Sequence, residues 1–195
     1  MPSKSHTELQ GDRWTSLARL PDSIGTQRLV LRKPRMDDAE PIFAGWTQDA
    51  EVTLYLTWRP HDAISQTEQF LATSIEAWNS DGRAVFVITT RELDVPIGLI
   101  EARFENTFVA SVGYLMRRSE WNRGYMTEAC RAVVDRLLAL PEIWRIWAYC
   151  DVENGASARV LERSGMQHEG ILRRAILHPN RSATPRDVHL YARVR

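Results

Sequence analysis

The sequence lacks several features that would assign a protein class at once. It has no excess of either charge, since 25 Lys and Arg balance 25 Asp and Glu among 195 residues. A nucleic-acid binder held mainly by phosphate neutralisation is therefore not expected. No apolar run approaches the roughly 20 residues that span a bilayer, so no membrane association is predicted. The first residues also lack the apolar stretch of a secretory signal peptide.

Cysteine and metal-ligand patterns are equally scarce. Cys130 and Cys150 form neither a metal-ligand spacing nor a disulfide framework, which fits a reducing cytoplasm. The histidines without ligand spacing, which we expect at the surface or in loops, are His61, His168, His178 and His189. We therefore predict no metal site.

The chain is long enough to bury a core, and one domain is the default for its length. Residues 1–25 are polar and irregular, and we interpret them as an N-terminal extension. The domain itself is predicted over residues 26–195.

Hydrophobic patterning predicts a single α/β domain with the order β-α-α-β-β-β-α-β-α-β-β. Asp37 or Asp38 is predicted to cap the first helix, and a capping box at 65–68 to begin the second. A third helix runs from about Gly124 to Pro141, and Asn154 caps a fourth that Gly165 ends. The predicted strands lie at 28–32, 84–90, 97–104, 110–116, 144–151, 170–177 and 187–194.

The most informative segment covers residues 116–129, where a predicted strand ends in a short loop and a helix begins. The first N–H groups of a helix have no partner within it, and the helix dipole adds positive charge there. Such a site suits a phosphate, and Gly124 lets the backbone approach it closely. The segment therefore predicts a phosphorylated cofactor. The same residues also fit an ordinary loop that caps a helix.

Five segments in order resemble the GNAT superfamily of N-acetyltransferases, and within it the RimJ/RimL branch of ribosomal-protein N-terminal acetyltransferases. The likeness covers roughly residue 26 to the C-terminus. It rests on residues 26–32, 112–115, 121–129, 151–166 and the hairpin at 169–173 and 187–191. It implies a GNAT-type domain whose mixed central sheet has splayed middle strands. It also implies acetyl-CoA as cosubstrate and direct attack on it by a primary amine, in a ternary complex. Neither cysteine lies at a motif position, so no cysteine is expected to carry the acyl group.

Three positions depart from the superfamily pattern. Trp121 stands at the first position of the loop motif, where the branch often carries it. Met126 puts a large side chain where the backbone approaches a pyrophosphate, which is expected to shift the cofactor slightly. Leu161 stands where many relatives carry a tyrosine acid, so this helix offers no tyrosine to the departing thiolate.

The resemblance implies that three places hold the cofactor. The loop and helix start would bind the pyrophosphate, the strand before them would pair with the pantetheine arm by main chain, and the next helix start would bond that arm. The loop residues are Trp121, Asn122, Arg123, Gly124, Tyr125, Met126 and Thr127. The strand residues are Tyr114, Leu115 and Met116, and the second helix start offers Asn154 and Ser157.

Amide formation needs an amine that loses a proton and a donor for the departing thiolate. Ser157 is the candidate donor, because it lies one helical turn before Leu161 on the same face. Its alternative role is a local helix hydrogen bond. Glu101, in the middle of its strand, is the candidate base, with Glu105 as the fallback. A solvated strand carboxylate is the alternative.

The acceptor amine is left open by the sequence. The branch favours a protein N-terminal α-amine. The alternative is a small-molecule amine such as a polyamine, an amino sugar or an amino-acid-like toxin, and a weakly catalytic acyl-CoA-binding module is a third class. We expect a cytoplasmic protein, with a homodimer left open.

Overall fold

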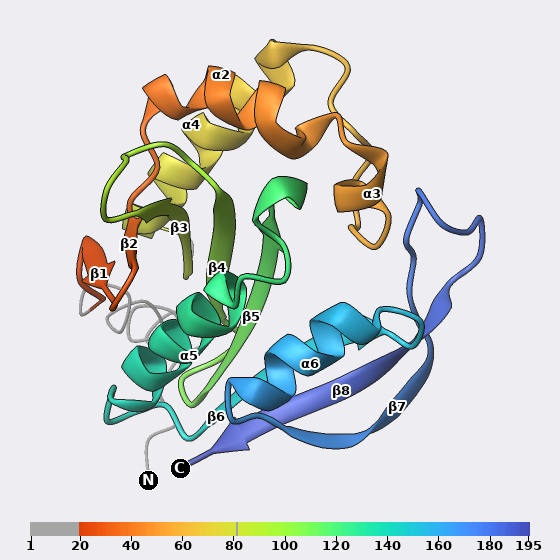
Figure 1. Ribbon diagram of the computed structural model, residues 1–195. Helices are drawn as coiled ribbons and strands as arrows, with labels where there is room; N and C mark the ends of the chain where they lie inside the picture. The colour runs from red at the N-terminus through yellow and green to blue at the C-terminus, as the bar shows by residue number, and fades with distance from the viewer. Residues whose placement is uncertain (1–19, 81) are drawn as a thin grey trace, which may run out of the picture.

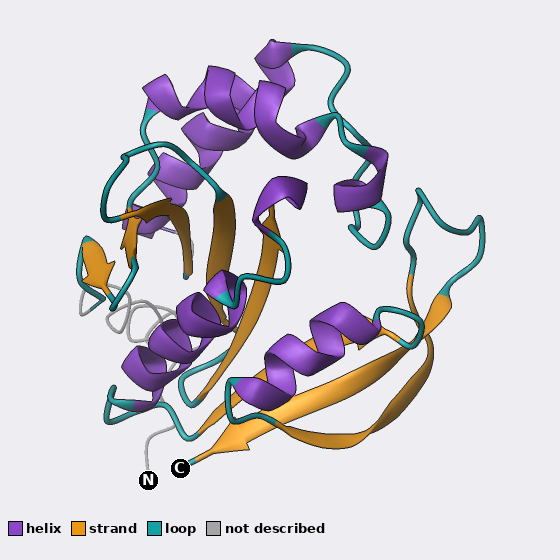
Figure 2. Cartoon of the chain, viewed as in Figure 1, coloured by secondary structure: helices purple, strands orange, loops and turns teal. Residues whose placement is uncertain are grey.

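The computed structural model describes residues 20–80 and 82–195, which build one mixed sheet with helices on both faces (Figures 1 and 2). Its eight strands follow the order β1-β2-β3-β4-β5-β6-β8-β7. β5 and β6 are parallel, and every other neighbouring pair is antiparallel. The predicted α/β class with a mixed central sheet is confirmed.

The strands span Ser23–Gly25 (β1), Leu29–Arg32 (β2), Arg83–Thr90 (β3), Gly98–Phe104 (β4), Val109–Met116 (β5), Arg145–Asp151 (β6), Gln167–Ile176 (β7) and Arg186–Val194 (β8). The α-helices span Ala39–Ile42 (α2), Ala50–Thr53 (α3), Ile64–Ser80 (α4), Tyr125–Leu138 (α5) and Gly155–Arg163 (α6). The predicted element order is confirmed, with β1 and α3 as additions. Within the described ranges no helix has the length and apolarity needed to cross a bilayer.

The stretch before β2 is more ordered than its polar composition predicts. Residues 1–19 of the predicted extension lie outside the described residues. Ser23–Gly25 forms β1, which pairs with β2, and Leu20 and Ile24 are buried in the core. A strand of three residues carries no readable alternation, which is why the sequence pattern missed it.

Alternation along the central strands creates two buried layers. On β3, Phe86 and Ile88 belong to the core that α5 covers, whereas Val85 and Val87 face the core that α2 and α4 cover. Figure 2 shows these helices gathered in two groups around the sheet. Alternate residues of one strand therefore lie on opposite faces of the sheet. The same alternation decides on which face each candidate site residue lies.

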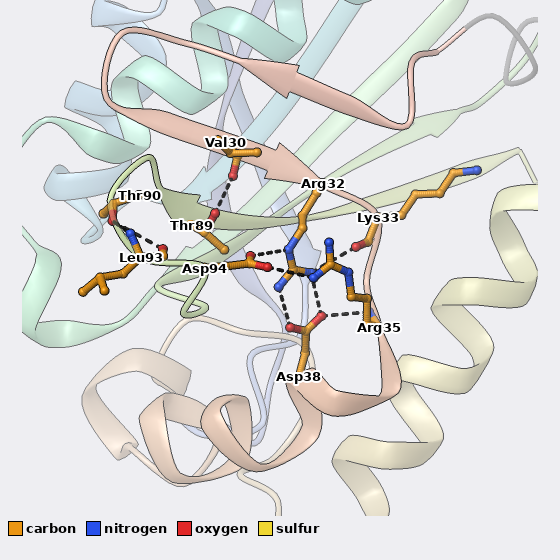
Figure 3. A network of polar contacts seen from close by, with 9 residues as sticks. All are labelled: Val30, Arg32, Lys33, Arg35, Asp38, Thr89, Thr90, Leu93 and Asp94. Atoms are coloured by element: carbon orange, nitrogen blue, oxygen red, sulfur yellow. Dashed lines mark hydrogen bonds and ion pairs between the residues drawn. The ribbon is translucent and has the colours of Figure 1, made fainter.

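An ion-pair network centred on a buried arginine ties β2 to the 3-10 turn before α2 and to the loop between β3 and β4 (Figure 3). Arg32, only 7% exposed, pairs with Asp38 at 2.7 and 2.9 Å and with Asp94 at 2.6 Å. The hydrogen bond to Asp38 raises the pKa of Arg32 further above its ordinary value. Asp38 stands at the start of α2 but makes no side-chain cap bond there. Asp38 is thus the N-cap residue of α2 by position, but its carboxylate caps the preceding 3-10 turn, Met36–Asp38, by accepting the N–H of Arg35 at 2.8 Å.

The start of α4 also differs from its prediction. The helix begins at Ile64, and the side chain of Gln66 accepts the N–H groups of Asp62 and Ala63 at 2.6 and 3.2 Å. Ser65 lies inside the helix, so the predicted capping box is wrong. The predicted cap of α6 is confirmed, since the Asn154 side chain accepts the Ser157 N–H at 3.1 Å.

Candidate active site

The two middle strands separate soon after they begin. β5 and β6 are in register only at Val109–Arg145, Ala110–Ile146 and Ser111–Trp147. Figure 1 shows them running apart from this common end. The later residues of β5 therefore face a gap with main-chain groups that no strand pairs on that side, within the described sheet. The splay implied by the resemblance is confirmed.

A cavity of about 540 Å³, here called the first cavity, lies along this gap. It is bounded by the end of β5, the loop before α5, and the start of α6. Of the residues predicted to hold a cofactor, all except Arg123 line it: Tyr114, Leu115, Met116, Trp121, Asn122, Gly124, Tyr125, Met126, Thr127, Asn154 and Ser157. Residues that are distant in sequence are thus brought to one cavity, in the arrangement predicted.

The loop before α5 leaves its helix start open. Gly124 stands at the N-cap with φ of 76°, a left-handed conformation, and no side chain caps the helix there. The first N–H groups of α5 consequently have no partner from a capping side chain. Met126, expected to crowd this site, is 7% exposed and packs into the core with α5. Met126 also lines the first cavity, so the expected shift of the cofactor stays a prediction.

Two loop residues make contacts of another kind. Arg123 pairs with Glu120 at 3.3 Å, and its carbonyl accepts from Arg28 at 2.9 Å. Arg28 also pairs with Glu128 at 2.7 Å, which fastens the loop to β2. The Trp121 indole donates to the Met116 carbonyl at 2.7 Å, so this carbonyl already has a partner inside the chain. The bond from the Arg117 N–H to the Ile97 carbonyl sets the register with β4, and in this register the main-chain groups of Leu115 face β4. Of the three predicted strand residues, Tyr114 is therefore the one whose main-chain N–H and carbonyl both face the gap without a partner from a strand of the described sheet.

Ser157 meets a partner that the sequence did not indicate. Its hydroxyl lies 2.8 Å from the Tyr114 hydroxyl, which also lies 3.2 Å from the Ser157 carbonyl. Burial raises the pKa of the Tyr114 phenol well above its ordinary value, so the phenol stays protonated. Tyr114 was predicted to contribute only main-chain groups. Strand alternation places its ring on the α6 side, a contact between residues 43 positions apart that no local pattern reveals.

Positive charge in the first cavity comes from α6. Arg159 and Arg163 line it and are four positions apart, so they share one face of the helix. Sequence reasoning missed both, although their spacing after Ser157 was a usable signal. Cys150 also lines this cavity, and burial raises the pKa of its thiol to about 11. A protonated thiol is a poor nucleophile, which agrees with the prediction that no cysteine carries the acyl group.

A second cavity of about 460 Å³ lies on the α2 and α4 face of the same strands. Glu101 lines it and is held by Arg103 at 2.7 and 2.9 Å and by Arg83 at 3.0 Å. Glu105 accepts the Ser111 hydroxyl at 2.6 Å. Both predicted carboxylates are therefore present in the cavity but already engaged. The proton-acceptor role of Glu101 stays a prediction.

The two cavities meet between the splayed strands. Five residues line both of them: Tyr55, Leu56, Tyr114, Leu115 and Tyr149. The segment after α3 that carries Tyr55 is held by Asn180, whose amide donates to the carbonyls of Thr53 and Trp58 at 2.8 and 2.7 Å. Asn180 belongs to the connection between β7 and β8, which faces α3 across the gap in Figure 1. Two distant segments thus close over the junction.

These features fit the predicted acetyl-CoA. The open start of α5 offers N–H groups to a pyrophosphate, and Arg159 and Arg163 add positive charge. The unpaired side of β5 offers amide partners to a pantetheine arm. The shape of the loop before α5 depends on Gly124. Any residue with a β-carbon would be strained at its positive φ and would disturb the loop that is predicted to bind the pyrophosphate.

The sequence of this chain matches a known protein family and several of its members. A family model described as an acetyltransferase (GNAT) domain matches residues 28–167. The N-acetyltransferase p20 of Bacillus licheniformis, itself uncharacterized, is 30% identical over 155 residues, which cover 78% of this chain and 86% of that protein.

Two solved structures show the same fold. The microcin self-immunity acetyltransferase MccE, in complex with acetyl-CoA and AMP, has a TM-score of 0.81 at 19% identity, covering 90% of this chain and 98% of that chain. RimL, a ribosomal alpha-N-protein acetyltransferase in complex with coenzyme A, has a TM-score of 0.78 at 20% identity, covering 88% and 97%. At these identities the likeness concerns the fold alone.

Proposed function

The chain belongs to the GNAT acetyltransferase family, and from that premise we propose that this acetyl-CoA-dependent N-acetyltransferase acts on the α-amine of a protein N-terminus. The observation that carries the acceptor class is the composition of the second cavity. It adjoins the first cavity, carries balanced charge and has aromatic walls.

The charge balance separates the acceptor classes. The second cavity holds two arginines, Arg83 and Arg103, against two carboxylates, Glu101 and Glu105. A polyamine carries several positive charges, which a site without net negative charge does not offset. An N-terminal peptide presents one ammonium group followed by neutral amides. The balance therefore supports a peptide over a polyamine.

The walls of the cavity supply contacts for such a peptide. Trp58, Trp147 and Tyr149 line it and offer apolar area with polar tips. The pair with Glu101 uses Nε and Nη2 of Arg103, which leaves Nη1 for a carbonyl or carboxylate of the acceptor. Gly113, which faces Glu101 in the strand register, has no atom within 4 Å of where a β-carbon would stand. This keeps the floor of the cavity open beside the reacting centre.

In this proposal the chain holds the cofactor from the three predicted places. Residues 121–127 bind the pyrophosphate through main-chain N–H groups, Arg159 and Arg163 lie beside it, and the main chain of Tyr114 pairs with the pantetheine arm. When bound, acetyl-CoA supplies a thioester whose carbonyl carbon the amine attacks. Asn154 orients the start of α6, and Ser157 donates a hydrogen bond to the sulfur that departs.

Replacing Ser157 with alanine should lower turnover at saturating acetyl-CoA by roughly 10-fold to 10²-fold. The effect is bounded because a thiol already leaves readily as thiolate, with a pKa of about 8.5. Ser164→Ala is the matched control, since Ser164 is a buried serine that bonds the Val160 carbonyl and does not line the first cavity. Steady-state kinetics should show lost turnover only for Ser157→Ala. Wild-type turnover would leave Ser157 as a helix residue.

Release of free coenzyme A across a panel of amines tests the acceptor class. The panel contains N-terminal peptides with free and blocked α-amines, a polyamine, an amino sugar and free amino acids. We expect release with free N-terminal peptides and none with blocked ones. Turnover of small amines without turnover of peptides would replace this proposal with the small-molecule class. No turnover with any amine would favour an acyl-CoA-binding module. A homodimer stays a prediction, and size-exclusion chromatography would measure the oligomeric state.

A further inference from the structure

A buried histidine beside the junction of the two cavities has no role in the account above. His178 lies in the connection between β7 and β8, lines the first cavity and is 1% exposed. Within the described residues, neither ring nitrogen makes a hydrogen bond of ordinary geometry. Buried polar groups are nearly always bonded, so an imidazole left in this state requires an explanation. The sequence predicted that His178 lies at the surface or in a loop. It does lie in a loop, but its side chain is buried.

The nearest charge to this ring is fixed and negative. Asp151, at the end of β6 with a fully buried side chain, has its carboxylate 3.7 Å from Nε2 of His178. Arg186 donates to Asp151 at 2.5 and 3.0 Å, and the N–H of Glu153 donates at 2.9 Å. Burial alone would raise the pKa of Asp151, but the hydrogen bonds from Arg186 hold it below its ordinary value. Asp151 is therefore a carboxylate in a fixed position.

Both members of the pair line the first cavity, close to the wall that it shares with the second cavity. Alternation along β6 puts Trp147, Tyr149 and Asp151 on one face, and the first two line the second cavity. Tyr55 packs edge-on against the His178 ring, with ring centroids 6.3 Å apart, and lines both cavities. Tyr55 therefore connects His178 to the wall between the two cavities, where an amine in the second cavity would meet a thioester in the first.

We propose that His178 accepts the proton of the acceptor ammonium group and that Asp151 is its positioning residue. The proton passes from the amine nitrogen to an imidazole nitrogen, and the freed electron pair attacks the thioester carbon. The imidazolium that forms is stabilised by the Asp151 carboxylate. The proposal rests on the N-acetyltransferase activity and holds for any primary amine acceptor.

The surroundings of both candidate bases support this assignment. Burial lowers the pKa of His178 below its ordinary value, so the imidazole is neutral and able to accept a proton near pH 7. The groups that act on it are the Asp151 carboxylate from β6, the Leu56 backbone, the Arg186 guanidinium from β8 and the Tyr55 ring. Asp151 and the Leu56 backbone raise the pKa of His178, but burial outweighs them. Glu101, by contrast, already accepts two hydrogen bonds from Arg103 and forms an ion pair with Arg83.

Variants of His178 and its neighbour test the proposal with any amine that the wild type acetylates. His178→Gln should lower kcat by roughly 10²-fold or more, because glutamine accepts no proton. The acid limb of the wild-type kcat–pH profile should disappear. Asp151→Asn should lower kcat and move this limb to lower pH, since an imidazolium without its carboxylate has a lower pKa. His189→Gln is the matched control, because His189 belongs to an exposed pair with His168 on β7.

Chemical rescue separates a proton acceptor from a structural ring. His178→Gly should regain activity when imidazole is added, and acetyl-CoA affinity by calorimetry should match the wild type in each variant. A His178→Gln enzyme within threefold of wild-type kcat with an unchanged pH profile overturns the proposal. A His178→Gly enzyme that added imidazole does not rescue also overturns it. The same holds if the acid limb of the kcat–pH profile disappears in Glu101→Gln but remains in His178→Gln. Failure of the wild type on N-terminal peptides would instead refute the acceptor class and leave His178 testable on another amine.

Discussion

Replacing Gly124 with valine is expected to weaken acetyl-CoA binding by roughly 10²-fold. Gly124 has φ of 76°, where a β-branched residue is strongly disfavoured. The loop must therefore move, and the N–H groups at the start of α5 then no longer point toward the pyrophosphate. Losing two hydrogen bonds to a charged group, at about 1.5 kcal/mol each, corresponds to this factor. Titration calorimetry of acetyl-CoA against both proteins measures it.

Gly165→Val is the matched control for this substitution. Gly165 also has positive φ, 87°, but it follows α6 and does not line the first cavity. Valine should strain the backbone at both positions and lower both melting temperatures. Only Gly124→Val should lose affinity. Equal losses of affinity would mean that general destabilisation is the cause, and wild-type affinity in Gly124→Val would show that the loop does not hold the cofactor.

Replacing Asp38 with alanine is expected to destabilise the fold by about 3 kcal/mol, because removing one partner leaves a buried charge uncompensated. The Arg32 side chain is 8% exposed, and its pair with Asp38 is the better buried of its two ion pairs. Asp94 still contacts Arg32, which limits the loss to the lower end of the range for broken buried pairs (Figure 3). Thermal denaturation should show a melting temperature lower by roughly 6–12 °C.

Asp37→Ala separates this ion pair from a general effect of lost charge at the turn. Asp37 is adjacent in sequence and exposed, so alanine there should change the melting temperature little. A similar fall in both variants would contradict the role given to the Arg32–Asp38 pair. A small change in Asp38→Ala would mean that Asp94 alone neutralises Arg32.

Local chemistry explains which parts of the fold the sequence predicted well. The cap of α6 by Asn154 and the left-handed Gly165 each depend on a few neighbouring residues, and both are confirmed. The central strands have strong alternation and were placed within about two residues. The capping box at 65–68 failed although its spacing was right, because Gln66 satisfies the N–H groups before the helix instead.

The site was predictable where it depends on main chain and unpredictable where it depends on side chains that meet across the sheet. The loop at Gly124 is a local strand–loop–helix pattern, and its residues line the first cavity. The contact between Tyr114 and Ser157 joins two elements through strand alternation and the packing of α6. The approach of His178 to Asp151 depends on how the connection after β7 folds back over β6. No spacing in the sequence encodes either contact.

Calorimetric titration of the wild-type protein with acetyl-CoA is the most direct test of the central claim, that the first cavity binds this cosubstrate. We predict one binding site per chain. At a hundredfold excess of ligand over its dissociation constant, binding should also stabilise the fold by about 2.7 kcal/mol, which thermal denaturation detects. The absence of both binding heat and thermal stabilisation with acetyl-CoA would contradict the account.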